Sequence, residues 1–209
     1  MKEEKHTTTI RPQVPVLLLI DVEPDGFFID RTKKSSEHTF FGKGIVAHVS
    51  FADPICQALQ RALHLAAVGV LDGKSVHLGG TYVNMEGPAF STRAESESYR
   101  KLDASVIGMT NLGEARLARE AEICYANIAL VTDYDCWKTD EEPVTADLVV
   151  QRIQKNVESA KSILRAALPK LPEGGCACHE VLRHSIVTSR EHWPAQTLEA
   201  LQPILGKYA

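Results

Sequence analysis

The chain has 209 residues, of which 44% are hydrophobic and 24% charged, and its formal net charge is −4. This composition is typical of a single globular domain, and without a basic block it makes nucleic acid an unexpected partner. Residues 1–5 carry no apolar core behind a basic head, and the early apolar run at residues 16–20 is too short to span a membrane. We therefore expect a cytoplasmic protein with no membrane partner.

Strands and helices are predicted to alternate along the chain after a polar start at residues 1–13. Apolar runs predict strands at residues 16–20, 27–32, 45–51, 75–78, 81–85, 106–108 and 123–131. The strands on either side of Gly79-Gly80 are expected to pair with each other. Apolar residues at helical spacing predict helices near residues 54–69, 111–121 and 146–168, with one or two short helices in the tail, and a further helix is predicted to begin at Arg93. Such alternation predicts an α/β fold.

Several of these helices carry residues that favour a helix start. The Asp-Pro pair at residues 53–54 is an N-cap followed by proline at the first helical position. Thr92 and Glu95 have the spacing of a capping box, and Asn111 and Glu114 repeat it. We therefore expect helices to begin at these three places.

Three polar segments are candidates for a shared site, namely residues 86–96, 109–111 and 132–135. Two of them directly follow predicted strands, and ligands of open α/β sheets bind beyond the carboxyl ends of the strands. In the second segment, free backbone N–H groups at a helix start and the Thr110 hydroxyl would favour an anion. The alternative is that Asn111 only caps the helix and Thr110 only fills the turn.

Asp133 and Asp135 follow an apolar strand two residues apart and can point into one crevice. Beside an adenine, one carboxylate could accept a hydrogen bond from the exocyclic amine. The other, kept protonated by burial, could donate to a ring nitrogen. The alternative is an acidic turn that ends a strand and binds nothing.

Phe90 and His48 are open to two interpretations each. Phe90 could stack on a flat ring or belong to the core, and aromatic residues are more often core. His48 lies within a predicted apolar strand, where a hydrogen-bonded interior histidine is the simpler interpretation.

The five cysteines, at positions 56, 124, 136, 176 and 178, do not have the pattern of a secreted disulfide framework. Cys176 and Cys178 with His179 resemble half of a zinc site, but no second pair of ligands stands near them in the sequence. We therefore expect no metal, and either a local disulfide or two free thiols.

Four motifs closely resemble the 5′-methylthioadenosine phosphorylase family of the trimeric purine nucleoside phosphorylase group. They are GTYVNMEGPAFSTRAES at residues 80–96, VIGMTN at 106–111, AREAEICYA at 118–126 and VTDYDCW at 131–137. The resemblance runs from about Phe28 to the C-terminus and implies a mixed central β-sheet flanked by helices. It divides the chain into an atypical segment at residues 1–27 and a phosphorylase-like domain at residues 28–209.

The resemblance implies cleavage of the N-glycosidic bond of methylthioadenosine by inorganic phosphate, which is a co-substrate, with no cofactor. It assigns Met109 to the ribose, Thr110 to phosphate, Phe90 to the base, and Asp133 and Asp135 to adenine. Ser91 and Ala146 match positions that tune substrate choice. His48 matches a histidine that reaches the 5′ pocket of a neighbouring subunit, so a homotrimer or a dimer of trimers is implied.

The chemistry of these residue types agrees with the implied reaction. Adenine leaves more easily when its N7 is protonated or hydrogen-bonded, and phosphate offsets the oxocarbenium-like charge on the sugar. Relatives acting on 6-oxopurines carry Asn at the position of Asp133, because an ionised carboxylate would repel O6.

The chain departs from the family in length. Family members have roughly a further third of a chain with a Gly-rich phosphate loop, an Arg-His pair and a Thr that bind phosphate, and none of these is visible here. The sequence therefore predicts a shortened phosphorylase lacking the N-terminal strands of the family. The alternatives are a non-catalytic remnant that binds nucleosides or associates with other subunits, and a 6-oxopurine nucleoside phosphorylase.

Overall fold

The computed structural model describes residues 17–20, 28–33, 36–71, 76–138, 146–171 and 173–209, and all statements below concern these residues. The strands are β1 (Leu17–Ile20), β2 (Phe28–Arg31), β3 (Val76–Leu78), β4 (Thr81–Met85), β5 (Ala104–Gly108) and β6 (Ile128–Val131). The α-helices are α1 (Gln57–Val70), α2 (Arg93–Lys101), α3 (Asn111–Glu120), α4 (Ala146–Ala167), α5 (Ala195–Ala200) and α6 (Gln202–Leu205). Short 3₁₀ segments occur at Ser36–His38, Leu168–Lys170, Ala177–His184 and Arg190–His192.

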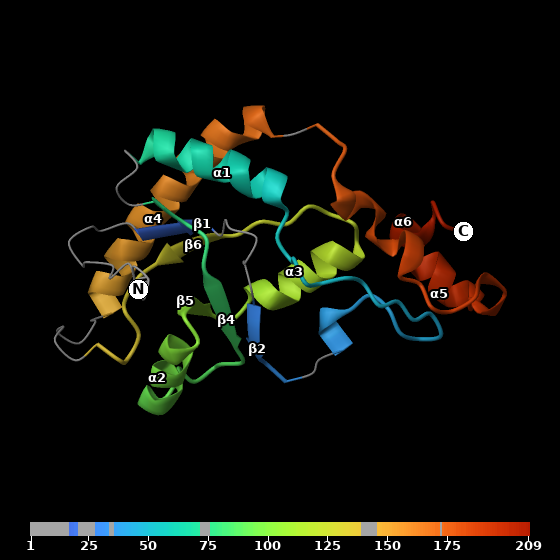
Figure 1. Ribbon diagram of the computed structural model, residues 1–209, viewed down its shortest axis with the longest axis horizontal. Helices are drawn as coiled ribbons and strands as arrows, with labels where there is room; N and C mark the ends of the chain where they lie inside the picture. The colour runs from blue at the N-terminus through green and yellow to red at the C-terminus, as the bar shows by residue number, and fades with distance from the viewer. Residues whose placement is uncertain (1–16, 21–27, 34–35, 72–75, 139–145, 172) are drawn as a thin grey trace, which may run out of the picture.

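The predicted α/β fold is confirmed, with strands that form two three-stranded sheets and helices packed around them (Figure 1). One sheet has the order β2-β4-β5 and is parallel throughout. The other has the order β3-β1-β6, with β1 parallel to β3 and antiparallel to β6. Because β4 and β5 are parallel neighbours, their carboxyl ends lie at the same edge of the sheet.

The one pairing predicted between two strands is wrong. The strands before and after Gly79-Gly80 do not pair with each other, because β3 belongs to one sheet and β4 to the other. Both glycines have positive φ, 87° and 126°, which is a conformation that redirects the chain and that residues with a Cβ rarely adopt. They therefore mark the point where the chain passes between sheets.

The predicted strand at residues 45–51 is also absent. Ile45 and Ala47 make only isolated bridges. The backbone around them pairs with residues 173–209, which we call the C-terminal segment, and the His48 N–H donates to the Ser185 carbonyl there at 2.8 Å. Residues 123–127 likewise remain outside β6, which begins at Ile128. Of these two apolar runs only Ile45 is buried, and Val46 and Ile123 are exposed, so the runs predicted neither a sheet partner nor continuous burial.

The predicted capping hydrogen bonds are found at one of the three helix starts. At α2, Thr92 Oγ1 accepts from the Glu95 N–H and Glu95 accepts from the Thr92 N–H, so the predicted capping box is confirmed. Helix α1 begins at Gln57 rather than at the Asp-Pro pair, and its N-cap is Cys56 in an extended conformation. The Cys56 N–H donates to the Tyr125 carbonyl at 2.7 Å, which holds the preceding chain against the β6 side of the molecule.

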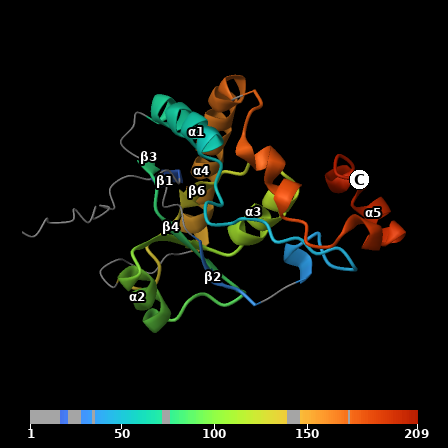
Figure 2. The same cartoon turned by 45° about the vertical axis from the view of Figure 1, so that its right-hand side comes forward.

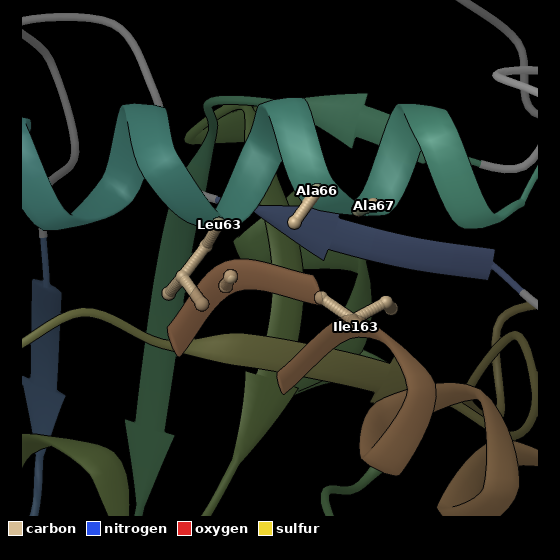
Figure 3. Close-up of a cluster of buried hydrophobic side chains, with 5 residues drawn as sticks. Leu63, Ala66, Ala67 and Ile163 are labelled. Carbon is tan, nitrogen blue, oxygen red and sulfur yellow. The ribbon is translucent and has the colours of Figure 1, made fainter. Parts of the chain in front are cut away.

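Helices α1 and α4 pack together over the sheet that contains β1 and β6 (Figures 1 and 2). Their contact contains a buried cluster of Leu63, Ala66 and Ala67 from α1 with Ile163 and Ala167 from α4 (Figure 3). Small alanines in this contact let the two helices approach closely. Helix α4 has 22 residues, but in the described part of the chain no helix is both long and apolar enough to cross a membrane.

The C-terminal segment forms a second packed cluster, away from the α1–α4 contact (Figure 2). Its buried residues are Ile45, Leu182, Leu201 and Leu205. Glu122 ties this segment to the end of α3: its carboxylate accepts from the Leu182 N–H at 2.9 Å and the Tyr208 hydroxyl at 2.7 Å, and pairs with Lys207 at 2.6 Å. Burial alone would raise the pKa of Glu122, but these donors outweigh burial and lower it.

Replacing Leu63 with Ala should destabilise the protein strongly. Leu63 is 5% exposed in the α1–α4 cluster, so Leu63→Ala leaves a cavity that should cost about 2–5 kcal/mol of the free energy of unfolding. Leu65→Ala is the matched control in the same helix, because Leu65 is 69% exposed and should change stability by about 0.5 kcal/mol at most. Urea unfolding measures both, and equal losses would contradict the packing described.

Glu122→Gln should reduce the dependence of stability on acid pH. The lowered pKa means that the Glu122 carboxylate stabilises the folded state fully above its ordinary pKa of 4.5, and that this stability is lost as pH falls through the lowered pKa. The variant should therefore be less stable than the parent at pH 7 and show a flatter profile in acid. Urea midpoints across pH test this, with exposed Glu199→Gln as the control expected to follow the parent.

Candidate functional site

Asn84 joins the ends of β4 and β5 to the start of α3. Its side chain is 1% exposed in an otherwise apolar strand. The Oδ1 atom accepts from the Leu112 N–H at 3.0 Å, and the Nδ2 group donates to the Met109 carbonyl at 3.2 Å. We call residues 84–85 and 109–112 the strand–helix corner, and Asn84 fixes its shape because each hydrogen bond satisfies a backbone group near the helix start.

The predicted cap of α3 by Asn111 and Glu114 is wrong. The N-cap is Thr110, whose side chain makes no capping hydrogen bond, and Asn111 lies inside the first turn. There Asn111 is buried and accepts from the Tyr125 hydroxyl at 3.3 Å. The acceptor for a backbone N–H at this helix start comes instead from Asn84 in β4, outside the helix.

Thr110 and Met109 occupy the corner as the sequence predicted. Thr110 is exposed, and its hydroxyl makes no hydrogen bond to the residues that the structure describes. The Met109 side chain lies against Gly87, where a Cβ would come within 2.8 Å of its Sδ atom. Gly87 also has a positive φ of 74°, so both its space and its conformation require glycine. The segment containing Phe90 and Ser91 is thereby anchored beside Met109.

Phe90 does not belong to the core, and none of the described aromatic rings packs against it. It is 84% exposed, so the core alternative is wrong. Its neighbour Ser91 is half-buried, and the Ser91 hydroxyl points to Met85 Sδ at 3.6 Å, the last residue of β4. The Ser91 position is therefore fixed relative to the corner, whereas the Phe90 ring projects from it.

The acidic turn after β6 reaches the same neighbourhood. Cys136, one residue beyond Asp135, contacts the Ser91 carbonyl through its sulfur at 3.5 Å. The Asp133 carboxylate accepts from the Thr132 hydroxyl at 2.8 Å and from the Asp135 N–H at 3.0 Å. Asp135 has a φ of 59°, a left-handed conformation that Asp and Asn tolerate best among residues with a Cβ.

The burial expected for the acidic pair is not found. Asp133 is exposed and Asp135 is half-buried. No hydrogen bond between described residues joins either carboxylate to Thr110. The structure therefore brings together the segments that carry Met109, Ser91 and the acidic pair through backbone and sulfur contacts, and leaves Asp133 exposed to solvent.

His48 and Ala146 are not brought to this group by any described contact. His48 is exposed rather than interior, which overturns the interior alternative, and its backbone pairs with the C-terminal segment. Ala146 is the first residue of α4, and its side chain lies outside the described part of the chain. Much of the loop that precedes it, residues 139–145, and most of the atypical segment, residues 1–16 and 21–27, also lie outside it.

Four cysteines meet at one place that sequence reasoning missed. The Sγ atoms of Cys56, Cys124, Cys176 and Cys178 all lie within 4.8 Å of one another, and all are free thiols. No second pair stands near Cys176 and Cys178 in the sequence, but Cys56 and Cys124 come from distant segments to lie beside them, and of the two expected states the free thiols are found. The number of cysteines was the only sign of such a cluster in the sequence. Their wide separation along the chain gave no indication that four of them converge.

A family model described as "Phosphorylase superfamily" matches residues 21–169. The chain belongs to the phosphorylase superfamily. The match spans β2 through the end of α4 and contains the strand–helix corner and the acidic turn. The candidate site residues of this superfamily member therefore lie within the matched part of the chain. Cys176 and Cys178 lie beyond it.

Similar proteins include S-methyl-5′-thioadenosine phosphorylases from two bacteria. The protein of Geobacter sulfurreducens is 53% identical over 188 residues, which cover 90% of this chain and 65% of the relative. That of Gloeobacter violaceus is 52% identical over 191 residues, covering 90% and 63%. The chain thus spans a little under two thirds of the length of these relatives.

Solved structures give the same result for the fold. A methylthioadenosine phosphorylase from an Antarctic soil metagenomic library superposes with a TM-score of 0.83 at 42% identity, over 91% of this chain and 66% of that one. The methylthioadenosine phosphorylase of Schistosoma mansoni in complex with adenine gives 0.72 at 29% identity, over 82% and 66%. The likeness therefore extends over most of the described chain.

Removing the Asn84 side chain should open the strand–helix corner. Asn84→Ala leaves the Leu112 N–H and the Met109 carbonyl without their partner in a buried place, which should cost about 1–3 kcal/mol of the free energy of unfolding. Asn127→Ala is the matched control, because the half-buried Asn127 side chain makes no hydrogen bond to described residues. Urea unfolding compares them, and a loss at Asn84 no larger than at Asn127 would contradict the role of Asn84.

Proposed function

We propose that this phosphorylase-superfamily chain carries out phosphorolysis of 5′-methylthioadenosine to adenine and 5-methylthioribose 1-phosphate. The observation that carries the proposal is that an aspartate turn after β6 packs against Ser91 beside the strand–helix corner. A base-binding group and an anion-binding group would then share one edge of the molecule. The activity named for the relatives from Geobacter and Gloeobacter supports the same reaction.

The phosphate subsite of the proposal is the start of α3. This helix has ten residues, its N-terminal N–H groups and dipole favour an anion, and the exposed Thr110 hydroxyl has no other described partner. Met109 precedes it and would contact the ribose between phosphate and base. Its position is set by Gly87 on one side and by Asn84 on the other.

The base subsite of the proposal is the acidic turn. Asp133 and Asp135 would hold adenine, with a carboxylate accepting from the 6-amino group and a carboxyl proton serving N7. Phe90 would face the base, and the bound base would then cover its exposed ring. Ser91 and Ala146 would tune substrate choice, and His48 would approach the 5′ group from a neighbouring subunit.

The proposed reaction exchanges one bond to the anomeric carbon for another. The C1′–N9 bond breaks with its electron pair moving to the purine, whose N7 takes a proton from the acidic turn. A phosphate oxygen then forms the new bond to C1′, and its negative charge offsets the oxocarbenium-like charge that develops on the sugar. Inorganic phosphate is the co-substrate, and the proposal requires no cofactor.

The exposure of Asp133 favours a second candidate. In that case the chain binds adenine nucleosides, or associates with other phosphorylase subunits, without turning over substrate.

Helix α4 carries a set of exposed apolar residues that a homo-oligomer could bury, namely Val150, Ile153, Val157 and Leu164. We infer a cytoplasmic homo-oligomer in either case, with a trimer as the expected state, and light scattering with size exclusion measures it.

A phosphorolysis assay separates the two candidates. Purified protein with methylthioadenosine should release adenine in phosphate buffer and none when sulfate replaces phosphate. Release without phosphate would indicate hydrolysis and contradict the proposed reaction. No release at high protein concentration, with methylthioadenosine binding retained in calorimetry, would establish the non-catalytic candidate.

Asp133→Asn should shift preference from 6-aminopurines toward 6-oxopurines. An Asn amide can donate to O6, whereas the Asp133 carboxylate repels it, so the ratio of kcat/KM for methylthioadenosine over inosine should fall by about tenfold or more. Asp103→Asn is the matched control, since Asp103 is an exposed residue just beyond α2. An unchanged ratio would contradict the proposed base recognition. A parent that prefers inosine would instead support a 6-oxopurine phosphorylase.

A further inference from the structure

We propose that Cys56, Cys124, Cys176 and Cys178 form a structural zinc site. It is separate from the proposed catalytic site and does not depend on the proposed phosphorolysis. Four thiolates are a ligand set that structural zinc sites use, and such sites are closed, with no position left for substrate. The role inferred is to hold three distant parts of the chain together.

The spacing of the sulfur atoms fits a tetrahedral ion. A Zn–S bond of about 2.3 Å gives sulfur atoms separated by about 3.8 Å along each edge of the tetrahedron. The Sγ atoms of Cys56 and Cys176 are 3.5 Å apart, and every pair in the group lies within 4.8 Å. All four thiols therefore converge on a common point, whereas two separate disulfides would need only pairwise contacts of about 2.05 Å.

The cysteines come from three segments that other contacts already hold in place. Cys56 is the N-cap of α1, and its N–H bond to the Tyr125 carbonyl sets it beside Cys124 in the loop before β6. Cys176 and Cys178 begin the C-terminal segment at Ala177–His184. Because these segments are fixed independently, a metal would enter a site whose ligands are already close.

The surroundings suit a group of thiolates. The Cys178 N–H donates to the Cys176 sulfur at 3.5 Å, and backbone N–H donors of this kind stabilise a charged sulfur. The His179 Nε2 atom lies 3.4 Å from the Cys124 sulfur, where a ring N–H can donate to it. Lys207 in turn donates to the His179 carbonyl at 2.6 Å, which helps to hold the residue that carries this ring.

Loading the site is a ligand exchange that balances without any oxidant. Four thiols bind one Zn²⁺, four Zn–S bonds form, and four protons pass to solvent, which leaves a group of net charge −2. No electron is transferred, so the cysteines stay reduced. A consequence is that the chain should be more stable with zinc than without it.

The chain supplies its own matched control in the fifth cysteine. Cys136 is exposed and lies outside the cluster, against the Ser91 carbonyl. Protein purified without chelators or a metal-affinity tag is analysed by elemental mass spectrometry. The parent and Cys136→Ser should hold about one zinc per chain. Cys56→Ser and Cys178→Ser should lose zinc by about tenfold or more, because a three-thiolate site binds far more weakly.

A second measurement decides the matter even if the cluster variants fail to fold. Parent protein stripped of metal with an organomercurial and a chelator is titrated with Co²⁺. The thiolate-to-cobalt charge-transfer absorption and the visible bands of tetrahedral cobalt should saturate at about one Co²⁺ per chain. The same result is expected for Cys136→Ser, and a melting temperature raised by added zinc should accompany it.

Three results would overturn the zinc site. They are zinc well below stoichiometry together with no cobalt–thiolate band, iron in place of zinc, or disulfides between the four cysteines. Intact mass after alkylation under denaturing, non-reducing conditions detects the last of these. A disulfide-bonded cluster withholds its thiols from alkylation, whereas a zinc-bound cluster yields all of them once the protein is denatured with a chelator.

Discussion

The two hydrogen bonds of the buried Asn84 side chain are the interaction on which the candidate site depends. They connect β4, the end of β5 and the first turn of α3, which are the elements that place Met109 and Thr110. Leaving a buried amide unpaired costs free energy, so the corner closes in one arrangement only. The Ser91 segment and the acidic turn are then positioned relative to this corner, through Met85 and Cys136.

Local patterns in the sequence predicted the parts of the fold that local physics determines. The capping box of α2, the long amphipathic α4 and the apolar runs of β1, β2, β4 and β5 all appear as expected. The failures share a cause, because each needed a partner from far along the chain. Residues 46–48 pair with the C-terminal segment, and the Leu112 N–H at the start of α3 donates to Asn84 of β4. A polar residue inside the apolar strand Thr81–Met85 was the available sign of such a partner.

The candidate site and the cysteine cluster show the same limit. The motif segments could be named from sequence, and the parallel pairing of β4 and β5 explains why the segments after these two strands lie at one edge. The exposure of Phe90 could not be foreseen, since its ring was expected to belong to the core or to stack on a ligand, whereas the exposure of Asp133 agrees with the alternative of an acidic turn that only ends a strand. Cysteines 56, 124, 176 and 178 converge only because the C-terminal segment folds back against α1 and the loop before β6. The spacing of the cysteines in the sequence does not predict this packing.

The structure of the protein with adenine and phosphate bound tests most directly whether the corner and the acidic turn form one site. We expect adenine within hydrogen-bonding distance of Asp133 or Asp135, and phosphate at the start of α3 in contact with the Thr110 hydroxyl. Both ligands would lie on the same side of the Asn84 side chain. Adenine bound away from the acidic turn, or phosphate bound away from α3, would contradict this expectation.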